Sequence, residues 1–472
     1  MAMDLKKILK NASYLFFSDV VIKLISALVT ILIARYLGAT DYGMLSLALA
    51  FSFITAYFTD LGSTHTFMRE ATKKNADIAR LVSSIFKVKI CLAFMTSVAA
   101  YIIIEMFYTD IHFKNIMYCI VFPVIFGTVL QGTSIAYFQA TEKMKITAYI
   151  RITTSLVTSS ILGCAFIFKW SLNIIAPLYG LSSILAGIIG ISILIKEIGI
   201  TNGWDSNIVT GLFSFTINGL IYMILPQMGP IILEKVSTFQ DVGYFSAAYR
   251  IPALLYQVPG VVAAAFYPKL FLYGNSKELD EHYKLNKLEL KVMSFLGLLM
   301  ALPFTLHSEW WINMLLGENW SAAAPVLAIL IVMVIMQSIN YPLADHLTTI
   351  GRQRYRAVVM LIALITGVTL YGVLGSKFGV VGGAYAAVSI EIIVFLSFLM
   401  LINKGIQLFL FGAGINIFSF SVTYFLFNKV IVFGNHIIHM VFSGLIYMLL
   451  VILIDKKLQQ SIFMLIRKRG IL

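Results

Sequence analysis

The chain has 472 residues, of which 60% are hydrophobic and only 12% are Asp, Glu, Lys or Arg. A soluble core of this length cannot bury so much apolar surface, so the composition excludes a soluble globular protein and indicates a polytopic membrane protein. The formal net charge is +13. In a membrane protein such an excess is typical of cytoplasmic loops facing lipid headgroups, and no basic patch with interleaved polar aromatic residues points to nucleic acid.

The first apolar run follows Lys6, Lys7 and Lys10, as it would in a signal peptide. This run is about 21 residues long, contains Asp19 and Lys23 and lacks a small-x-small cleavage site, so we interpret it as a retained helix. Cys91, Cys119 and Cys164 lie inside apolar runs without Cys-x-x-Cys spacing, and we interpret them as packing residues.

Runs of about 20 apolar residues are long enough to cross ~30 Å of hydrocarbon. The sequence predicts fourteen of them, at 14–34, 43–66, 83–105, 116–138, 148–169, 174–195, 208–233, 244–268, 287–307, 321–347, 357–376, 380–402, 408–427 and 433–454. Placing the N-terminus in the cytoplasm puts most of the 35 Lys and Arg residues on the inner side, as the positive-inside rule requires. We therefore expect a multi-pass protein of the cytoplasmic membrane with both termini cytoplasmic.

The predicted loops are no longer than roughly 25 residues, which is too short for a folded extramembrane domain. This argues against most membrane glycosyltransferases and polymerases, which need a soluble catalytic lobe or a large external loop. We also find no metal-ligand spacing, nucleophile triad, Walker loop or nucleotide fingerprint in the sequence. The expectation is a protein that is not an enzyme, without catalytic residues, metal or cofactor, whose work is done between the helices.

A short motif recurs once in the chain. Asp41 to Ala48 and Asp241 to Ala248 share the pattern Asp-x-Gly-x-x-Ser-x-Ala. One recurrence at this distance predicts two related halves. The expected architecture is an all-α membrane protein with an N-terminal six-helix lobe at 1–200, a C-terminal six-helix lobe at 201–405, and two additional helices with a basic cytoplasmic tail at 406–472.

Residues 10 to about 90 resemble the polysaccharide-biosynthesis (O-antigen type) flippases of the multidrug/oligosaccharidyl-lipid/polysaccharide exporter superfamily. The resemblance rests on Asn11-Ala12-Ser13-Tyr14, Ile33 to Gly38, Asp41-Tyr42-Gly43, Asp60-Leu61-Gly62 and Arg69-Glu70, and on a second-half signature at Val242 to Arg250 followed by Tyr267-Pro268. It implies two six-helix lobes in a V around a central cavity, and outward transport of polyprenyl-pyrophosphate-linked oligosaccharides. The implied partners are the lipid-linked oligosaccharide, membrane lipids, H⁺ or Na⁺, and other polysaccharide-assembly proteins.

Polar residues inside the predicted spans are candidates for function, because a charge at mid-bilayer costs at least ~2.5–3.5 kcal/mol. The first helix carries Asp19, Lys23, Ser26 and Thr30 in one stripe. Lys23 would bind phosphate, unless it only neutralises Asp19. The eighth helix carries Ser246, Arg250 and Gln257. Arg250 would grip two phosphate oxygens, unless its side chain extends outward to the headgroups.

Carboxyl groups in the spans are candidates for ion coupling, since a desolvated carboxyl can bind and release a proton near neutral pH. Glu391 lies near mid-span, whereas Asp60 and Asp345 lie near inner helix ends, where solvated capping is the alternative. Glu391 has the alternative of a structural partner for a cation, or of a protonated packing residue. Amides that would contact sugar, or bond between helices instead, are Gln131, Asn218, Gln227, Gln337 and Asn340.

The primary hypothesis is a flippase in which Lys23 and Arg250 hold the pyrophosphate and a cation gradient resets the cavity. A drug/cation antiporter of the same superfamily is the first alternative, and it should favour an acidic cavity. A membrane glycan polymerase or ligase is the second, and it would require an exposed catalytic loop.

Overall fold

The computed structural model describes residues 2–73, 76–200, 202–210, 219–221, 223–431 and 433–455, with side chains described at residue 22 and from residue 25 onward. Every regular element in this part of the chain is a helix. Eleven helical segments of the described chain are long and apolar enough to cross a membrane. The prediction of an all-α membrane protein is therefore confirmed.

The chain folds as two compact units, residues 1–246 and 247–472. The helices of the first unit are α1 (Ala2–Phe58), α2 (Ser63–Ala71), α3 (Ile78–Phe107), α4 (Ile111–Ala140), α5 (Met144–Phe168), α6 (Leu172–Ile198), η1 (Ser206–Val209), η2 (Leu225–Gln227), α8 (Met228–Val236) and the start of α9 (Phe239–Leu255). Within this unit α4 packs closely along α6, and α1 packs along α5.

The second unit contains the remainder of α9 and the helices that follow it. These are α10 (Gln257–Asn275), α11 (Leu279–Leu306), α12 (Ser308–Leu315), η3 (Glu318–Trp320), α13 (Ala323–Leu330), α14 (Val332–Thr349), α15 (Gln353–Leu401), α16 (Gly405–Phe425), η4 (Leu426–Val430) and α17 (His436–Ile454). Here α11 is the central helix, because it packs against α10, α14, α16 and α17.

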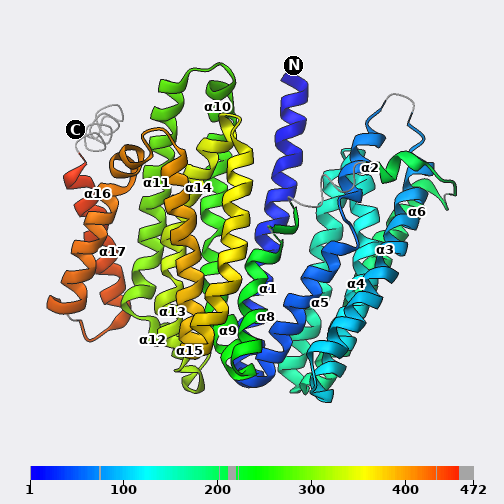
Figure 1. Ribbon diagram of the computed structural model, residues 1–472, viewed down its shortest axis with the longest axis horizontal. Coiled ribbons are helices and arrows are strands. Elements are labelled where there is room, and N and C mark those ends of the chain that lie inside the picture. The colour runs from blue at the N-terminus through cyan, green and yellow to red at the C-terminus, as the bar shows by residue number, and fades with distance from the viewer. Residues whose placement is uncertain are drawn as a thin grey trace. The chain divides into compact units, whose positions relative to one another are not determined.

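Two helices are too long to cross the membrane once. At 1.5 Å per residue, the 57 residues of α1 and the 49 of α15 would extend about 86 and 74 Å, against ~30 Å of hydrocarbon. Each is interrupted by a glycine with positive φ, Gly38 (φ 78°) in α1 and Gly379 (φ 57°) in α15, a conformation that favours glycine. Figure 1 shows α1 turning back at its lower end.

The eleven candidate spans are fewer than the predicted fourteen, and the glycine interruptions account for part of the difference. The predicted segments 14–34 and 43–66 both fall in α1, and 357–376 and 380–402 both fall in α15. The predicted segment 208–233 lies partly outside the described residues, as does the basic tail after residue 455. The domain boundaries at 200 and 405 and the cytoplasmic termini stay predictions.

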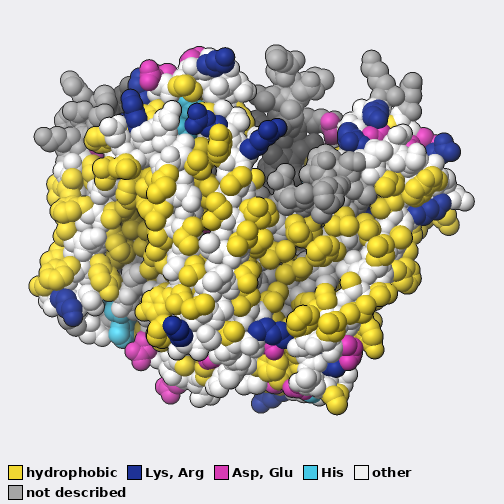
Figure 2. Space-filling model, viewed as in Figure 1, with side chains coloured by type: hydrophobic (Ala, Val, Ile, Leu, Met, Phe, Trp, Pro, Cys, Tyr) yellow, Lys and Arg dark blue, Asp and Glu magenta, His cyan; other side chains and the backbone are white. Residues whose placement is uncertain are grey.

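Side chains are distributed along the helices as a bilayer requires. Hydrophobic side chains cover the middle of the helices in both units, and Lys, Arg, Asp and Glu gather at the helix ends (Figure 2). Side-chain caps mark several helix starts: Asp77 accepts from the Arg80 N–H, Asp110 from the His112 N–H, and Asn435 from the Ile437 N–H. These caps satisfy backbone donors that the first helical turn leaves free.

The two copies of the repeated motif touch each other. A Cβ built on Gly43 would lie 1.9 Å from the Phe239 carbonyl oxygen, and a Cβ on Gly243 would lie 1.9 Å from the Ala39 carbonyl oxygen. The contact is reciprocal, because Ala39 and Phe239 hold corresponding places in the two copies, as Gly43 and Gly243 do. Glycine is required at both positions because the backbones approach too closely for any side chain.

A chain of three imidazoles links α17 to the end of α11. His307 Nε2 lies 2.7 Å from His439 Nδ1, and His307 Nδ1 lies 3.2 Å from His436 Nδ1. His439 Nε2 is 3.1 Å from the Phe427 carbonyl oxygen. One proton per ring satisfies every bond if each ring donates to the next, so the neutral form fits this chain.

Candidate functional site

Glu391 lies inside the second unit, in the part of α15 that follows Gly379, and its exposed fraction is only 6%. Two amides of α14 hold its carboxyl group. Gln337 Nε2 donates to Oε1 at 2.6 Å, and Asn340 Nδ2 donates to Oε2 at 2.8 Å. Asn340 also donates to the Glu391 carbonyl oxygen at 3.1 Å. The carboxyl group is therefore fixed in position by neutral donors.

Arg250 lies in the same region of the second unit. The Glu391 carboxyl and the Arg250 guanidinium both act electrostatically on the Tyr249 hydroxyl. Glu391 also acts on Tyr256 and Tyr371. Three residues that the sequence singled out, Arg250, Gln337 and Glu391, are thus brought into one polar region of a membrane-spanning bundle.

The helix carrying Arg250 is interrupted just after it. Pro252 lies inside α9, which ends at Leu255, and α10 begins at Gln257. Gln257 Nε2 donates to the Ala253 carbonyl oxygen at 3.2 Å, so this predicted substrate-binding amide also bridges the interruption. Proline cannot donate a backbone hydrogen bond, which weakens the helix at this point.

The region contains one buried acid together with several hydrogen-bonding groups. A buried carboxylate is costly unless it is paired, protonated or bound to an ion. Asn340 Oδ1 is sealed from solvent and accepts no hydrogen bond from the residues the structure describes. Hard oxygen ligands suit H⁺ and hard cations.

The first unit has a separate polar face, on α5. Ser26 Oγ of α1 lies 3.5 Å from Ser155 Oγ, and Gln131 Nε2 of α4 donates to Thr154 Oγ1 at 2.7 Å. Ser182 of α6 contacts Thr158 Oγ1 at 3.5 Å. No residue of α5 was among the predicted site residues, although Arg151, Thr154, Ser155 and Thr158 follow the spacing of one helix face.

Two predicted substrate-binding residues lie outside the described part of the chain, namely the Lys23 side chain and Asn218. The described Ser26 is exposed on α1. The role of the first-helix stripe therefore stays a prediction.

The other two carboxyl candidates have basic neighbours. Asp60 Oδ1 lies 2.7 Å from the Lys89 ammonium, and the Lys89 side chain is almost fully buried. Asp345 is 2% exposed, and its Oδ1 lies 4.0 Å from Arg356 Nη1. Asp345 also contacts a second buried carboxyl, Glu289, which the sequence analysis did not consider. Coupling by Asp60 or Asp345 stays a prediction.

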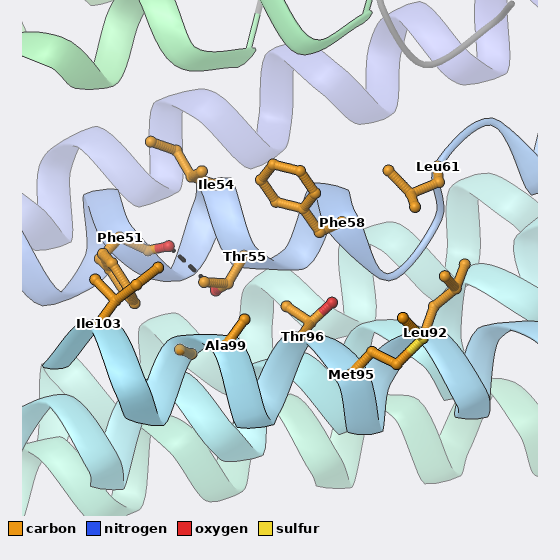
Figure 3. A pocket seen from close by; sticks show the side chains of 11 residues that line it. Phe51, Ile54, Thr55, Phe58, Leu61, Leu92, Met95, Thr96, Ala99 and Ile103 are labelled. Carbon is orange, nitrogen blue, oxygen red and sulfur yellow. Dashed lines mark hydrogen bonds between the residues drawn. The ribbon is translucent and has the colours of Figure 1, made fainter. Parts of the chain in front are cut away.

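An apolar groove of about 340 Å³ lies between the part of α1 after Gly38 and α3. Figure 3 shows Phe51, Ile54 and Phe58 of α1 on one side and Met95, Thr96 and Ala99 of α3 on the other. Of the lining residues that the structure describes, Thr55 and Thr96 alone carry hydroxyl groups, and the Thr55 hydroxyl already donates to the Phe51 carbonyl oxygen. These described lining residues carry no charge, so the groove fits a hydrocarbon chain better than a phosphate.

Within the described residues, no group of three or more His, Cys, Asp or Glu side chains is placed to hold a metal ion. The site is therefore defined by one buried carboxyl group, its two amide partners and a neighbouring guanidinium.

The family model for "Polysaccharide biosynthesis protein" matches residues 8–273, which is more than half of the chain. The chain belongs to this family. The match spans the repeated motif in both copies, together with Arg250 and Gln257. A comparison with proteins of curated function finds no significant sequence match.

Solved structures of several transporters have a similar fold. The lipid II flippase MurJ, in an inward closed conformation, superposes with a TM-score of 0.77 at 15% identity, covering 95% of this family member and 99% of MurJ. An inward-facing multidrug resistance MATE family transporter of the MOP superfamily gives 0.61 at 12% identity, covering 82% and 95%. A MOP superfamily transporter from Pyrococcus furiosus gives 0.58 at 12% identity, covering 85% and 96%. At these identities the likeness establishes the fold.

Proposed function

We propose that this polysaccharide biosynthesis protein flips polyprenyl-pyrophosphate-linked oligosaccharides from the cytoplasmic to the outer leaflet by alternating access. The family match and the fold shared with a lipid II flippase support this function. In the proposal, fourteen transmembrane helices form two six-helix lobes around a central cavity with two further helices at the C-terminus, and both termini are cytoplasmic.

The polar region around Glu391 and Arg250 carries the proposal. The substrate has a pyrophosphate and a glycan that must cross, and a polyprenyl tail that can remain in lipid. A guanidinium offers two parallel donors to phosphate oxygens, and Arg250 lies close to the Tyr249 hydroxyl, on which Glu391 also acts. We assign Arg250 and Lys23 to the pyrophosphate, with Ser26, Gln131, Asn218, Gln257 and Gln337 as glycan contacts.

Coupling to a cation gradient supplies the energy in this proposal. Glu391 is the principal candidate, because its carboxyl group is buried and two neutral amides orient it. Binding of H⁺ or Na⁺ would neutralise it, and release would restore its charge near Arg250. The two charge states would favour different packing of the helices around it, which is the differential interaction that a coupled transporter needs.

Deletion of the gene tests the function directly. The expected result is that a lipid-linked oligosaccharide accumulates on the inner leaflet and surface polysaccharide is lost. Complementation with Arg250→Ala should fail, Arg250→Lys should restore part of the activity, and Arg354→Ala should restore it fully because Arg354 is exposed. Normal surface polysaccharide with Arg250→Ala combined with Lys23→Ala would refute the assigned roles.

The fold is also shared with a multidrug MATE transporter, which favours drug/cation antiport as a second candidate. That function predicts that the deletion strain becomes more susceptible to cationic drugs while its surface polysaccharide is unchanged. The two phenotypes separate the candidates.

A further inference from the structure

Two carboxyl groups that are far apart in the sequence lie next to each other inside the second unit. Glu289 of α11 has an exposed fraction of 0%, and Asp345 of α14 one of 2%. Their side chains are hydrogen-bond neighbours. Two carboxylates in such contact repel each other strongly when both are ionised, so something positive must lie between them.

The oxygens that face this contact lack an ordinary donor. Glu289 Oε2 accepts from Asn286 Nδ2 at 3.0 Å. Glu289 Oε1 and Asp345 Oδ2 are both sealed from solvent, and no N–H or O–H group in the described part of the chain reaches them with hydrogen-bond geometry. A proton held between the two carboxyl groups satisfies both, because a protonated carboxyl group donates.

The surrounding charges allow for one such proton. Arg356 of α15 is the nearest cation, with Nη1 4.0 Å from Asp345 Oδ1. One guanidinium balances one of the two negative charges, and a single proton balances the other. Tyr267 of α10 interacts electrostatically with Asp345 and adds no charge as a neutral phenol.

The histidines beside the pair fit as neutral groups. His346 Nδ1 lies 3.2 Å from Asn286 Oδ1, and the Asn286 amide donates onward to Glu289 and to the Pro342 carbonyl oxygen at 2.8 Å. His282 Nε2 lies 2.7 Å from Thr349 Oγ1. The two rings contact each other edge to face, and Arg352 acts electrostatically on His346, so a further positive charge here would be repelled.

We propose that Glu289 and Asp345 form a proton-binding site that holds one exchangeable proton between the two carboxyl groups. The neighbouring Arg356 side chain is 23% exposed, so the pair lies one side chain away from solvent. The existence of the site does not depend on the transported substrate. Its use as a coupling site, beside or in place of Glu391, rests on the proposed function.

Infrared difference spectroscopy of the purified full-length protein tests the site without any transport assay. The signal is the C=O stretching band of a protonated carboxylic acid at neutral pH. Among the other buried carboxyl groups of the described residues, Glu70 and Asp455 contact lysines and Glu391 does not. Glu391→Gln removes this remaining candidate, so the band that is left in the variant is expected to come from the pair. Glu289→Gln or Asp345→Asn in the Glu391→Gln background should abolish it.

Glu289→Gln is the variant best suited to fold, because the new amide can accept from Asn286 and donate to Asp345 while Arg356 balances the remaining charge. Should neither substitution in the pair fold, the Glu391→Gln protein alone still decides the matter. Absence of a protonated-carboxyl band from it at neutral pH would overturn the proposal. Loss of the band on adding Na⁺ at constant pH and ionic strength would also overturn it, because the pair would then be a sodium site.

Discussion

Removing the acid of the Asp60–Lys89 pair should lower the stability of the protein much more than removing the base. Lys89 Nζ lies 2.7 Å from Asp60 Oδ1, and the side chains are 3% and 29% exposed respectively. At an effective dielectric constant of ~20 the attraction is about 6 kcal/mol before desolvation costs are subtracted. The two partners differ in the hydrogen bonds that each of them keeps when the other is removed.

Asp60→Asn removes the negative charge opposite the buried Lys89 ammonium and leaves it only neutral acceptors, the new amide oxygen and the Thr64 hydroxyl at 3.0 Å. Removing one partner of a buried pair costs about 3–5 kcal/mol. Lys89→Met leaves Asp60 partly exposed and still accepting from the Ser63 hydroxyl at 3.1 Å, the Thr64 hydroxyl at 2.6 Å and the Thr64 N–H at 3.3 Å. We expect this variant to lose only about 1–2 kcal/mol.

Thermal unfolding in detergent, followed by tryptophan fluorescence, measures the difference. Asp60→Asn should lower Tm more than Lys89→Met, and the double variant should recover much of the loss of Asp60→Asn. Lys87→Met, an exposed lysine on the same helix, is the matched control and should change Tm little. Equal losses for the two single variants, or additive losses in the double variant, would refute the reasoning.

Three further predictions concern packing, pH and interhelical bonding. Gly43→Ala should lower the free energy of unfolding by about 1–3 kcal/mol, because the added Cβ meets a backbone oxygen. Gly163→Ala is the control, since its added Cβ would meet nothing within 4 Å, and it should not lower Tm. Equal effects of the two variants would contradict the packing argument. Burial and the neighbouring His439 and His436 lower the pKa of His307 to about 4. As the pH falls, the unfolded chain therefore binds a proton at this position before the folded chain does, and Tm should fall between about pH 6.5 and pH 4. His307→Gln should reduce this pH dependence of Tm, and an unchanged pH profile in the variant would contradict the prediction. Asn416 donates to the Lys291 carbonyl oxygen and to the Ser294 hydroxyl, both at 2.8 Å. Asn416→Ala should therefore lower the free energy of unfolding by roughly 1–2 kcal/mol, whereas Ser421→Ala, on an exposed face of the same helix, should change it little. Equal unfolding temperatures for the two variants would show that the bonds between α16 and α11 add no stability.

Helix type and the approximate positions of the spans followed from hydrophobicity, because a bilayer leaves few alternatives to helices. The breaks that the sequence predicted at 35–42 and 377–379 contain Gly38 and Gly379, where the backbone leaves the helical conformation. Residue-level contacts such as Gln337 with Glu391 depend on helix rotation and offset, which a single sequence does not determine.

Glu289 shows why one buried carboxyl group escaped prediction. The ninth span was predicted to begin at residue 287, which placed Glu289 in an interfacial turn where charge is common. In the structure α11 begins at Leu279, so Glu289 lies three turns into the helix and faces α14. Hydrophobicity did not predict this helix start, eight residues before the predicted span, because the first turns of α11 are charged.

The Gly43–Gly243 contact also carries information about ancestry. When equivalent residues of two copies meet reciprocally, a local dyad passes between them, and such self-complementary contacts are the mark of homodimers. Duplication and fusion of a half-length gene would have preserved that contact while freeing the two copies to diverge elsewhere. If the halves arose in this way, the carbonyls of Ala39 and Phe239 would mark the former dimer interface, at two glycines that cannot be replaced by a residue with a side chain.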